Sequence, residues 1–153
     1  MPQPRPLRLV ASYAKEDRWA VEALKKQLSG VRRAGKIEFW WDQKRDGRKW
    51  WDDEIEEWFE EADGFVVFVS PNYIDDEVKA YIHNHEVPVM KRRKEEGQIP
   101  AYCITVTPVD YGPDLGRFDF FNDKKPVPRE ELARGVYLNQ FVEEVIKGKF
   151  LKT

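Results

Sequence analysis

Residues 65–73 read FVVFVSPNY, and residues 82–88 read IHNHEVP. The first stretch opens with an apolar run, Phe65 to Val69, whose lack of polar alternation is typical of a strand covered by helices on both faces. The run ends at Ser70, and the second stretch places Glu86 on the helix expected to follow. A carboxylate beyond the carboxyl end of a parallel strand lies where α/β sheets bind ligands. Glu86 is therefore the first candidate for chemistry, and a solvated helix glutamate is the alternative interpretation.

Alternating strands and helices are predicted around this run. Short apolar or aromatic runs predict further strands at Leu7–Ser12, Ile37–Trp41 and Ala101–Val106. Periodic apolar residues predict helices at Glu16–Leu28 and Tyr81–Glu96, at Trp51, Ile55, Trp58, Phe59 and Ala62, and at Leu138, Phe141, Val142, Val145 and Ile146. The region 110–129 is expected to be mostly loop, with one short edge strand near Pro126-Val127. This order predicts right-handed crossovers and one sheet with helices on both faces.

Length and composition indicate one domain. A chain of 153 residues with a net charge of −2 has one core and no global field that draws it to nucleic acid or an anionic membrane. We expect a disordered start over residues 1–6, a domain over 7–149 and a C-terminal tail over 150–153. Cys103 is the only cysteine, which excludes an intramolecular disulfide and favours a reducing compartment. No signal peptide and no apolar run of roughly 20 residues is present, so a cytoplasmic location is expected.

Five short motifs, in order, resemble those of the Toll/interleukin-receptor (TIR) domain, particularly its bacterial members. They are Val10-Ala11-Ser12-Tyr13 with Glu16-Asp17, Trp41-Asp42 through Gly47 to Trp50, Ser70-Pro71-Asn72-Tyr73, Asn84-His85-Glu86-Val87-Pro88, and Leu115-Gly116-Arg117 with Lys125-Pro126-Val127. The second of these resembles the family's BB loop. The resemblance covers Leu7 to Ile146. It implies an α/β, flavodoxin-like three-layer sandwich with a central, mostly parallel five-stranded sheet and the strand Phe65–Val69 near its middle.

The resemblance also implies an activity. Many bacterial TIR domains cleave NAD at the nicotinamide–ribose bond, and the family's catalytic glutamate corresponds to Glu86. Cleavage gives an oxocarbenium-like ribose, whose developing charge a nearby anion stabilises. The bond that breaks joins the ribose to a cationic pyridinium ring, so nicotinamide leaves as a neutral molecule. Its departure needs no general acid, and one carboxylate is therefore enough. The resemblance thus implies a glycohydrolase or cyclase whose substrate is NAD, with no cofactor and no metal expected. It also implies an effector or signal-generating module of bacterial antiviral immunity.

Substrate-binding positions follow from the same motifs. Those at strand ends are Ser12 and Tyr13, expected beside the nicotinamide-riboside pocket, and Ser70 and Tyr73, expected at its rim. Those of the BB loop are Trp41, Asp42 and Trp50, with Lys44, Arg45 or Arg48 near the pyrophosphate. Ile82 stands one helical turn before Glu86, where many active members carry an aromatic residue. Periodicity instead predicts Trp40, Trp51 and Trp58 to be core residues.

The same residues also bear on other functions. His83 and His85 lie two apart, which on a helix directs them to nearly opposite sides, so a metal site with Glu86 is disfavoured. Ser70 stands where a phosphoryl-receiver domain needs an aspartate, and Walker and glycine-rich dinucleotide motifs are absent. The serious alternative is a non-catalytic TIR module that recruits other TIR domains. A glutamate in an Asn-His-Glu-x-Pro setting is not expected in a pure adaptor and favours the enzyme.

Partners are predicted from the family as well. We expect self-association with other TIR domains through the BB loop, Asp42 to Lys49, which commonly closes a site shared with a neighbouring subunit. A fused or separate sensor is expected to trigger activity, and neither nucleic acid nor membrane is an expected direct partner.

Overall fold

The computed structural model describes residues 5–42, 53–75, 85–97, 99–116 and 118–151. Its strands are β1 (Leu7–Ser12), β2 (Ile37–Trp40), β3 (Gly64–Val69), β4 (Ala101–Thr105) and β5 (Asp119–Phe120). Its longer helices are α1 (Arg18–Gln27), α3 (Asp53–Glu61), α5 (Val87–Gly97) and α7 (Glu131–Phe141), the last continued by the wider helical segment η5 (Val142–Phe150). Its short helical turns are η1 (Lys15–Asp17), α2 (Ser29–Arg33), α4 (Pro71–Ile74), α6 (Gly112–Leu115) and η4 (Asn122–Lys124).

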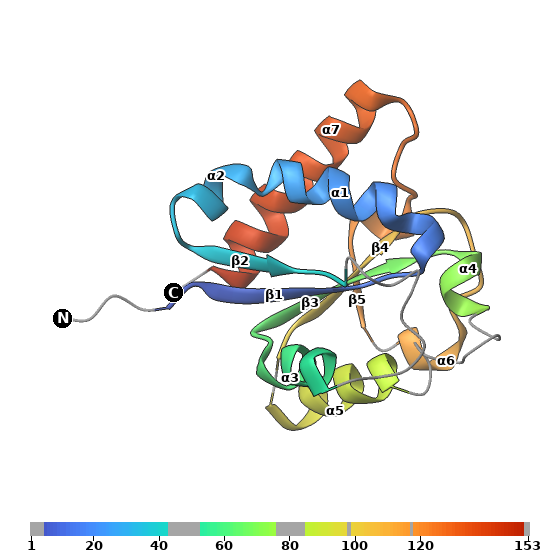
Figure 1. Ribbon diagram of the computed structural model, residues 1–153. Helices are drawn as coiled ribbons and strands as arrows, with labels where there is room; N and C mark the ends of the chain where they lie inside the picture. Colours follow the sequence, from blue (N-terminus) through green and yellow to red (C-terminus); the bar gives the residue numbers. More distant parts are fainter. Residues whose placement is uncertain (1–4, 43–52, 76–84, 98, 117, 152–153) are drawn as a thin grey trace.

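The five strands form one sheet in the order β2-β1-β3-β4-β5, and every neighbouring pair is parallel (Figure 1). The central position of β3 and the helix α5 that follows it confirm the flavodoxin-like fold predicted from the sequence. The strand order changes direction at β1 and β3, because β2 lies outside β1 whereas β4 and β5 continue beyond β3. Such a switch point, at the carboxyl ends of the strands, is where open α/β sheets bind ligands.

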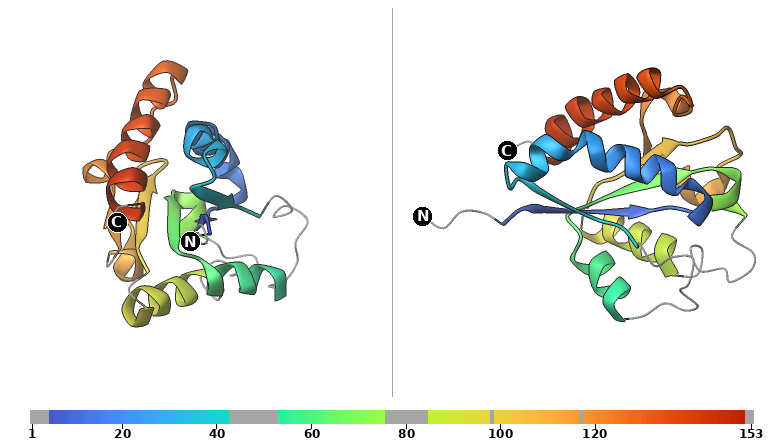
Figure 2. Two further views of the ribbon diagram at one scale, coloured as in Figure 1. Left: turned by 90° about the vertical axis from the view of Figure 1, so that its left-hand side faces the viewer. Right: turned by 45° about the horizontal axis from the view of Figure 1, so that its top comes forward.

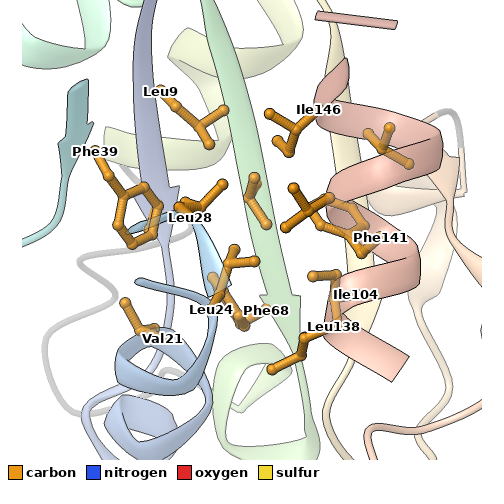
Figure 3. Close-up of a cluster of buried hydrophobic side chains, with 14 of the residues drawn as sticks. Leu9, Val21, Leu24, Leu28, Phe39, Phe68, Ile104, Leu138, Phe141 and Ile146 are labelled. Atoms are coloured by element: carbon orange, nitrogen blue, oxygen red, sulfur yellow. The ribbon is translucent and has the colours of Figure 1, made fainter. Parts of the chain in front are cut away.

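Helices cover both faces of the sheet, with α1 and α7 on one face and α3 and α5 on the other (Figures 1 and 2). The core on the α1 side includes Leu9, Leu24, Phe68, Ile104 and Phe141 (Figure 3). The core on the α5 side includes Val10, Ile55, Phe65, Met90 and Cys103. Successive residues of β1 and β3 thus alternate between two dry layers. This explains why all six residues of β3 are buried and why its sequence shows no polar alternation.

The fifth strand was predicted in the wrong place. It pairs with β4 at Asp119–Phe120, whereas the sequence predicted an edge strand near Pro126-Val127. After β5 the backbone turns away through Asn122, Asp123 and Lys124, whose φ angles are 57°, 51° and 66°. Val127 then donates one hydrogen bond to the Thr105 carbonyl at 2.9 Å. Pro126 has no N–H group to donate to a ladder, so this segment does not continue as a strand.

Two helix boundaries also differ from the predicted ones. The helix expected over Tyr81–Glu96 contains α5 from Val87 onward, with a wide turn at His85 and Glu86 before it, and residues 81–84 lie outside the described part. The last helix extends through Phe150, the first residue of the predicted tail. The Phe150 ring packs against Gly64, where the lack of a side chain leaves room for it. A Cβ added at Gly64 would lie only 3.0 Å from Phe150 Cε2.

A carboxylate anchors the start of β1. Arg5 donates two hydrogen bonds to Asp63, at 2.6 and 2.8 Å, and the Arg8 backbone N–H donates a third at 2.8 Å. Burial opposes the charge of Asp63, but these donors outweigh it and hold the pKa of Asp63 below 3.8. A depressed pKa adds stability above the unfolded-state pKa, and this contribution is lost as the pH falls through the folded-state value.

We expect Asp63→Asn to lower the free energy of unfolding by about 1 kcal/mol at pH 7, because the partly exposed hydrogen bonds from Arg5 and Arg8 lose their charged acceptor. The difference from wild type should shrink below pH 4. Denaturant unfolding at pH 7 and pH 3 measures it, with exposed Glu56→Gln as the matched loss of one negative charge. A difference that is the same at both pH values would contradict this account.

Candidate active site

Buried polar side chains gather at the switch point of the sheet. Ser12 is the last residue of β1, and Ser70 follows the last residue of β3, the neighbouring strand. Tyr73 lies on α4, which Figure 1 shows at the end of the sheet toward which β1 and β3 point. Glu86 lies in the turn that precedes α5. The side chains of these four residues come from three separate segments of the chain, namely Ser12, residues 70–73 and Glu86, and each residue is at most 1% exposed.

Ser12 links Tyr73 to Glu86. The Ser12 hydroxyl donates to Glu86 Oε1 at 2.7 Å, and its oxygen lies 2.7 Å from the Tyr73 hydroxyl oxygen. A serine hydroxyl has one proton, which here points to Glu86, so Tyr73 is the donor in the second bond. The order of donation is therefore Tyr73 to Ser12 to Glu86. Hydrogen bonds aligned in this way polarise one another and strengthen the donor that reaches the carboxylate.

Ser70 holds a second buried carboxylate, Asp17. The Ser70 hydroxyl donates to Asp17 Oδ2 and accepts a bond from the Tyr73 backbone N–H at 3.1 Å, which caps the start of α4. Burial is the main cause that raises the pKa of Asp17 above 3.8, and nearby Glu16 raises it further. The Ser70 bond and the more distant Arg129 act in the opposite direction.

Sequence reasoning did not include Asp17 among the site residues. It appeared only as part of an acidic helix start, a common and usually solvated feature. The available signal was its position, because an acidic residue a few positions after β1 lies at the same edge of the sheet as Ser70. Burial of that residue, which is 4% exposed, depends on the chain folding over it.

The side chains of Tyr13 and Trp41 lie on the α1 side of the sheet, opposite the face that α3 and α5 cover. The Tyr13 hydroxyl donates to the Asp42 backbone carbonyl at 2.5 Å, and its ring centroid lies 6.2 Å from that of Trp41. Both rings belong to the core on the α1 side, with the Arg18 guanidinium 5.3 Å from the centre of the Trp41 ring. Because successive strand residues point to opposite faces, Tyr13 cannot join Ser12 beside Glu86. The structure therefore does not bring Tyr13 or Trp41 to the candidate site.

A comparison with known families matches residues 10–134 to the model of the TIR domain. This match covers most of the chain and includes every strand from Val10 of β1 to β5. The chain belongs to the TIR domain family. A comparison with curated proteins found no match.

Five of the predicted substrate-binding residues of this TIR domain lie outside the described residues, namely Lys44, Arg45, Arg48, Trp50 and Ile82. His83 and the predicted core residue Trp51 lie outside them too. Asp42, the first residue of the predicted BB loop, is 3% exposed. Trp40 and Trp58, predicted as core, are half-buried and pack together with ring centroids 5.8 Å apart.

The described part of this TIR domain holds neither a candidate metal centre nor a candidate membrane span. Its histidine, cysteine, aspartate and glutamate side chains form no group of three or more that could hold a metal ion. None of its helices combines the length and the apolar character needed to span a membrane.

Proposed function

We propose that this TIR domain cleaves NAD at the nicotinamide–ribose bond and that Glu86 is the catalytic carboxylate. The observation that carries the proposal is the placement of Glu86, fully buried at the switch point with Ser12 donating to it at 2.7 Å. This combines the ligand-binding position of an α/β sheet with an oriented anion.

The chemistry requires little besides that anion. The glycosidic carbon–nitrogen bond breaks, its electron pair leaves with neutral nicotinamide, and positive charge develops on the ribose. A carboxylate held in a site from which water is excluded stabilises that charge more strongly than one in solvent. Water then captures the ribosyl cation in hydrolysis, or a nucleophile of the same molecule captures it in cyclisation. Chromatography of the products separates these two outcomes.

The direct test incubates purified protein with NAD and follows free nicotinamide. Release that depends on protein concentration supports the proposal. Absence of release over a wide concentration range, with folded protein, would contradict it.

Access to Glu86 leads to a second expectation. Glu86 is 0% exposed in the single chain, so NAD reaches it only when part of the chain moves. We propose that association with further copies of the domain drives that movement and completes the pocket. Specific activity should then fall about tenfold or more on dilution from the assembled to the monomeric state, as mass action requires. Light scattering alongside the assay checks this, and constant specific activity from a protein that stays monomeric would refute it.

The alternative function is a non-catalytic TIR module acting by association alone. Full burial of Glu86 is compatible with a structural carboxylate, and α7 exposes two large apolar side chains, Leu132 at 76% and Val136 at 65%. The two side chains lie one helical turn apart on the same face, and contiguous exposed apolar surface often marks an interaction site. Self-association without nicotinamide release would favour this alternative.

A further inference from the structure

Asp17 is a buried carboxylate that the proposed chemistry does not use. It ends η1, is 4% exposed, and its backbone N–H donates to the Ala14 carbonyl at 2.9 Å. Among the described residues, Ser70 is its side-chain hydrogen-bond donor, and Arg129 acts on it only through longer-range attraction. A buried carboxylate with so few donors is costly to the fold, which makes a structural role in stability an insufficient explanation.

The Asp17 carboxylate determines how the Ser70 hydroxyl is oriented. An ionised carboxylate can only accept, so the single Ser70 proton points to Asp17 and a lone pair remains for the Tyr73 backbone N–H. Ser70 therefore fixes the first turn of α4, a helix of only four residues. So short a helix has little internal stability, and its cap largely decides where it lies.

The same helix carries the Tyr73 hydroxyl. That hydroxyl donates to Ser12, and Ser12 donates to Glu86, at 2.7 Å in each case. Asp17 is thus connected to Glu86 through Ser70, the backbone and ring of Tyr73, and Ser12. Each step of the connection is a hydrogen bond or covalent chain among residues that are at most 4% exposed.

We propose that Asp17 is a positioning residue of the Glu86 site, which holds α4 through Ser70 and thereby directs Tyr73 and Ser12 toward the Glu86 carboxylate. The activity measurements of this inference rest on the proposed NAD cleavage. A positioning role needs the acceptor oxygen and shape of Asp17, whereas a role in electrostatics or proton transfer needs its charge. Asparagine keeps the acceptor and loses the charge, so it separates the two.

The test compares Asp17→Ala, Asp17→Asn and Ser70→Ala, with Glu16→Ala as the matched control. Glu16 is an exposed carboxylate beside Asp17 in the same turn. Asp17→Ala and Ser70→Ala should each lower kcat for nicotinamide release about tenfold or more with little change in KM, since misplacement of a reacting group is felt in the transition state. Asp17→Asn should recover activity to within about threefold of wild type, and Glu16→Ala should match wild type.

The double variant Asp17→Ala/Ser70→Ala should cost no more than either single change, because both break one connection. Thermal unfolding identifies any variant that fails to fold. If Asp17→Ala does not fold, Ser70→Ala still tests the proposal, because it removes the same hydrogen bond. An Asp17→Asn protein as impaired as Asp17→Ala would overturn the proposal, and so would additive losses in the double variant.

A spectroscopic measurement separates this inference from the proposed function. The ¹³C chemical shift of the Glu86 side-chain carboxyl carbon depends on the hydrogen-bond donors to that carboxylate. The signal is assigned by its disappearance from the spectrum of Glu86→Gln. That signal should move in Asp17→Ala and Ser70→Ala and stay in place in Asp17→Asn and Glu16→Ala. This pattern in a protein that releases no nicotinamide would reject NAD cleavage and retain the connection. An unmoved Glu86 signal in Asp17→Ala and Ser70→Ala would reject the connection, even in an active enzyme.

Discussion

Glu86→Gln is expected to reduce nicotinamide release from NAD by about a hundredfold or more while the protein remains folded. The substitution keeps the size of the side chain and an acceptor oxygen for Ser12, but it removes the negative charge that stabilises the ribosyl cation. Loss of one such electrostatic contact commonly costs a factor of about 100 to 1,000. The effect should fall on kcat, since the charge on the ribose develops only in the transition state.

The matched control is Glu96→Gln, an equal loss of charge at an exposed position of α5. It should leave nicotinamide release unchanged. Circular dichroism and thermal unfolding verify that both variants fold. If Glu86→Gln retained wild-type turnover, Glu86 would be a structural carboxylate and the catalytic group would have to be sought elsewhere.

The second large effect is expected from the hydroxyl groups that reach Glu86. Ser12→Ala removes the donor 2.7 Å from Glu86 Oε1, and Tyr73→Phe removes the donor to Ser12. A hydrogen bond to a charged acceptor contributes about 1.5 to 3 kcal/mol, and losing that much orientation of the catalytic carboxylate corresponds to roughly tenfold or more in rate. Tyr73→Phe should cost less than Ser12→Ala, because the Ser12 bond to Glu86 survives it.

A double-variant cycle tests whether the two hydroxyls act in series. If Tyr73 acts on Glu86 through its bond to Ser12, the combined variant should lose little more activity than Ser12→Ala alone. Tyr137→Phe is the control for the loss of a buried phenol hydroxyl, since Tyr137 donates at 2.7 Å to the Lys125 carbonyl on the other face of the sheet. Fully additive losses for Ser12 and Tyr73 would show that they contribute independently and that no relay exists.

Self-association and these side-chain effects can be measured separately. Dilution changes the assembled fraction of every variant alike, whereas Glu86→Gln acts on chemistry within whatever assembly forms. A variant that scatters light as wild type does and yet releases no nicotinamide has lost chemistry alone. The same comparison distinguishes an enzyme from an interaction module that merely assembles.

Local pattern alone predicted a parallel α/β sheet with a doubly covered strand at Phe65–Val69, and the resemblance to the TIR family predicted the central place of that strand. The unbroken apolar run Phe65–Val69 requires cover on both faces, and helices between strands permit only a parallel connection. The fifth strand escaped prediction because Asp119–Phe120 is only two residues long and has no periodicity to detect. Its pairing depends on β4 offering an edge, which is a long-range property of the fold.

At the site, the sequence itself indicated Glu86, because residues that follow a parallel strand meet the ligand-binding edge of the sheet, and the resemblance to TIR motifs added Ser12, Ser70 and Tyr73. Only the tertiary structure decided which of them touch. It placed Tyr13, the residue after β1, on the opposite face from Ser12, and it packed Trp41 beside Tyr13 in the core on the α1 side. It also brought Asp17 against Ser70 across 53 positions of the chain. Burial and hydrogen-bond partners arise from packing between distant segments, so no local pattern could assign Asp17 its place.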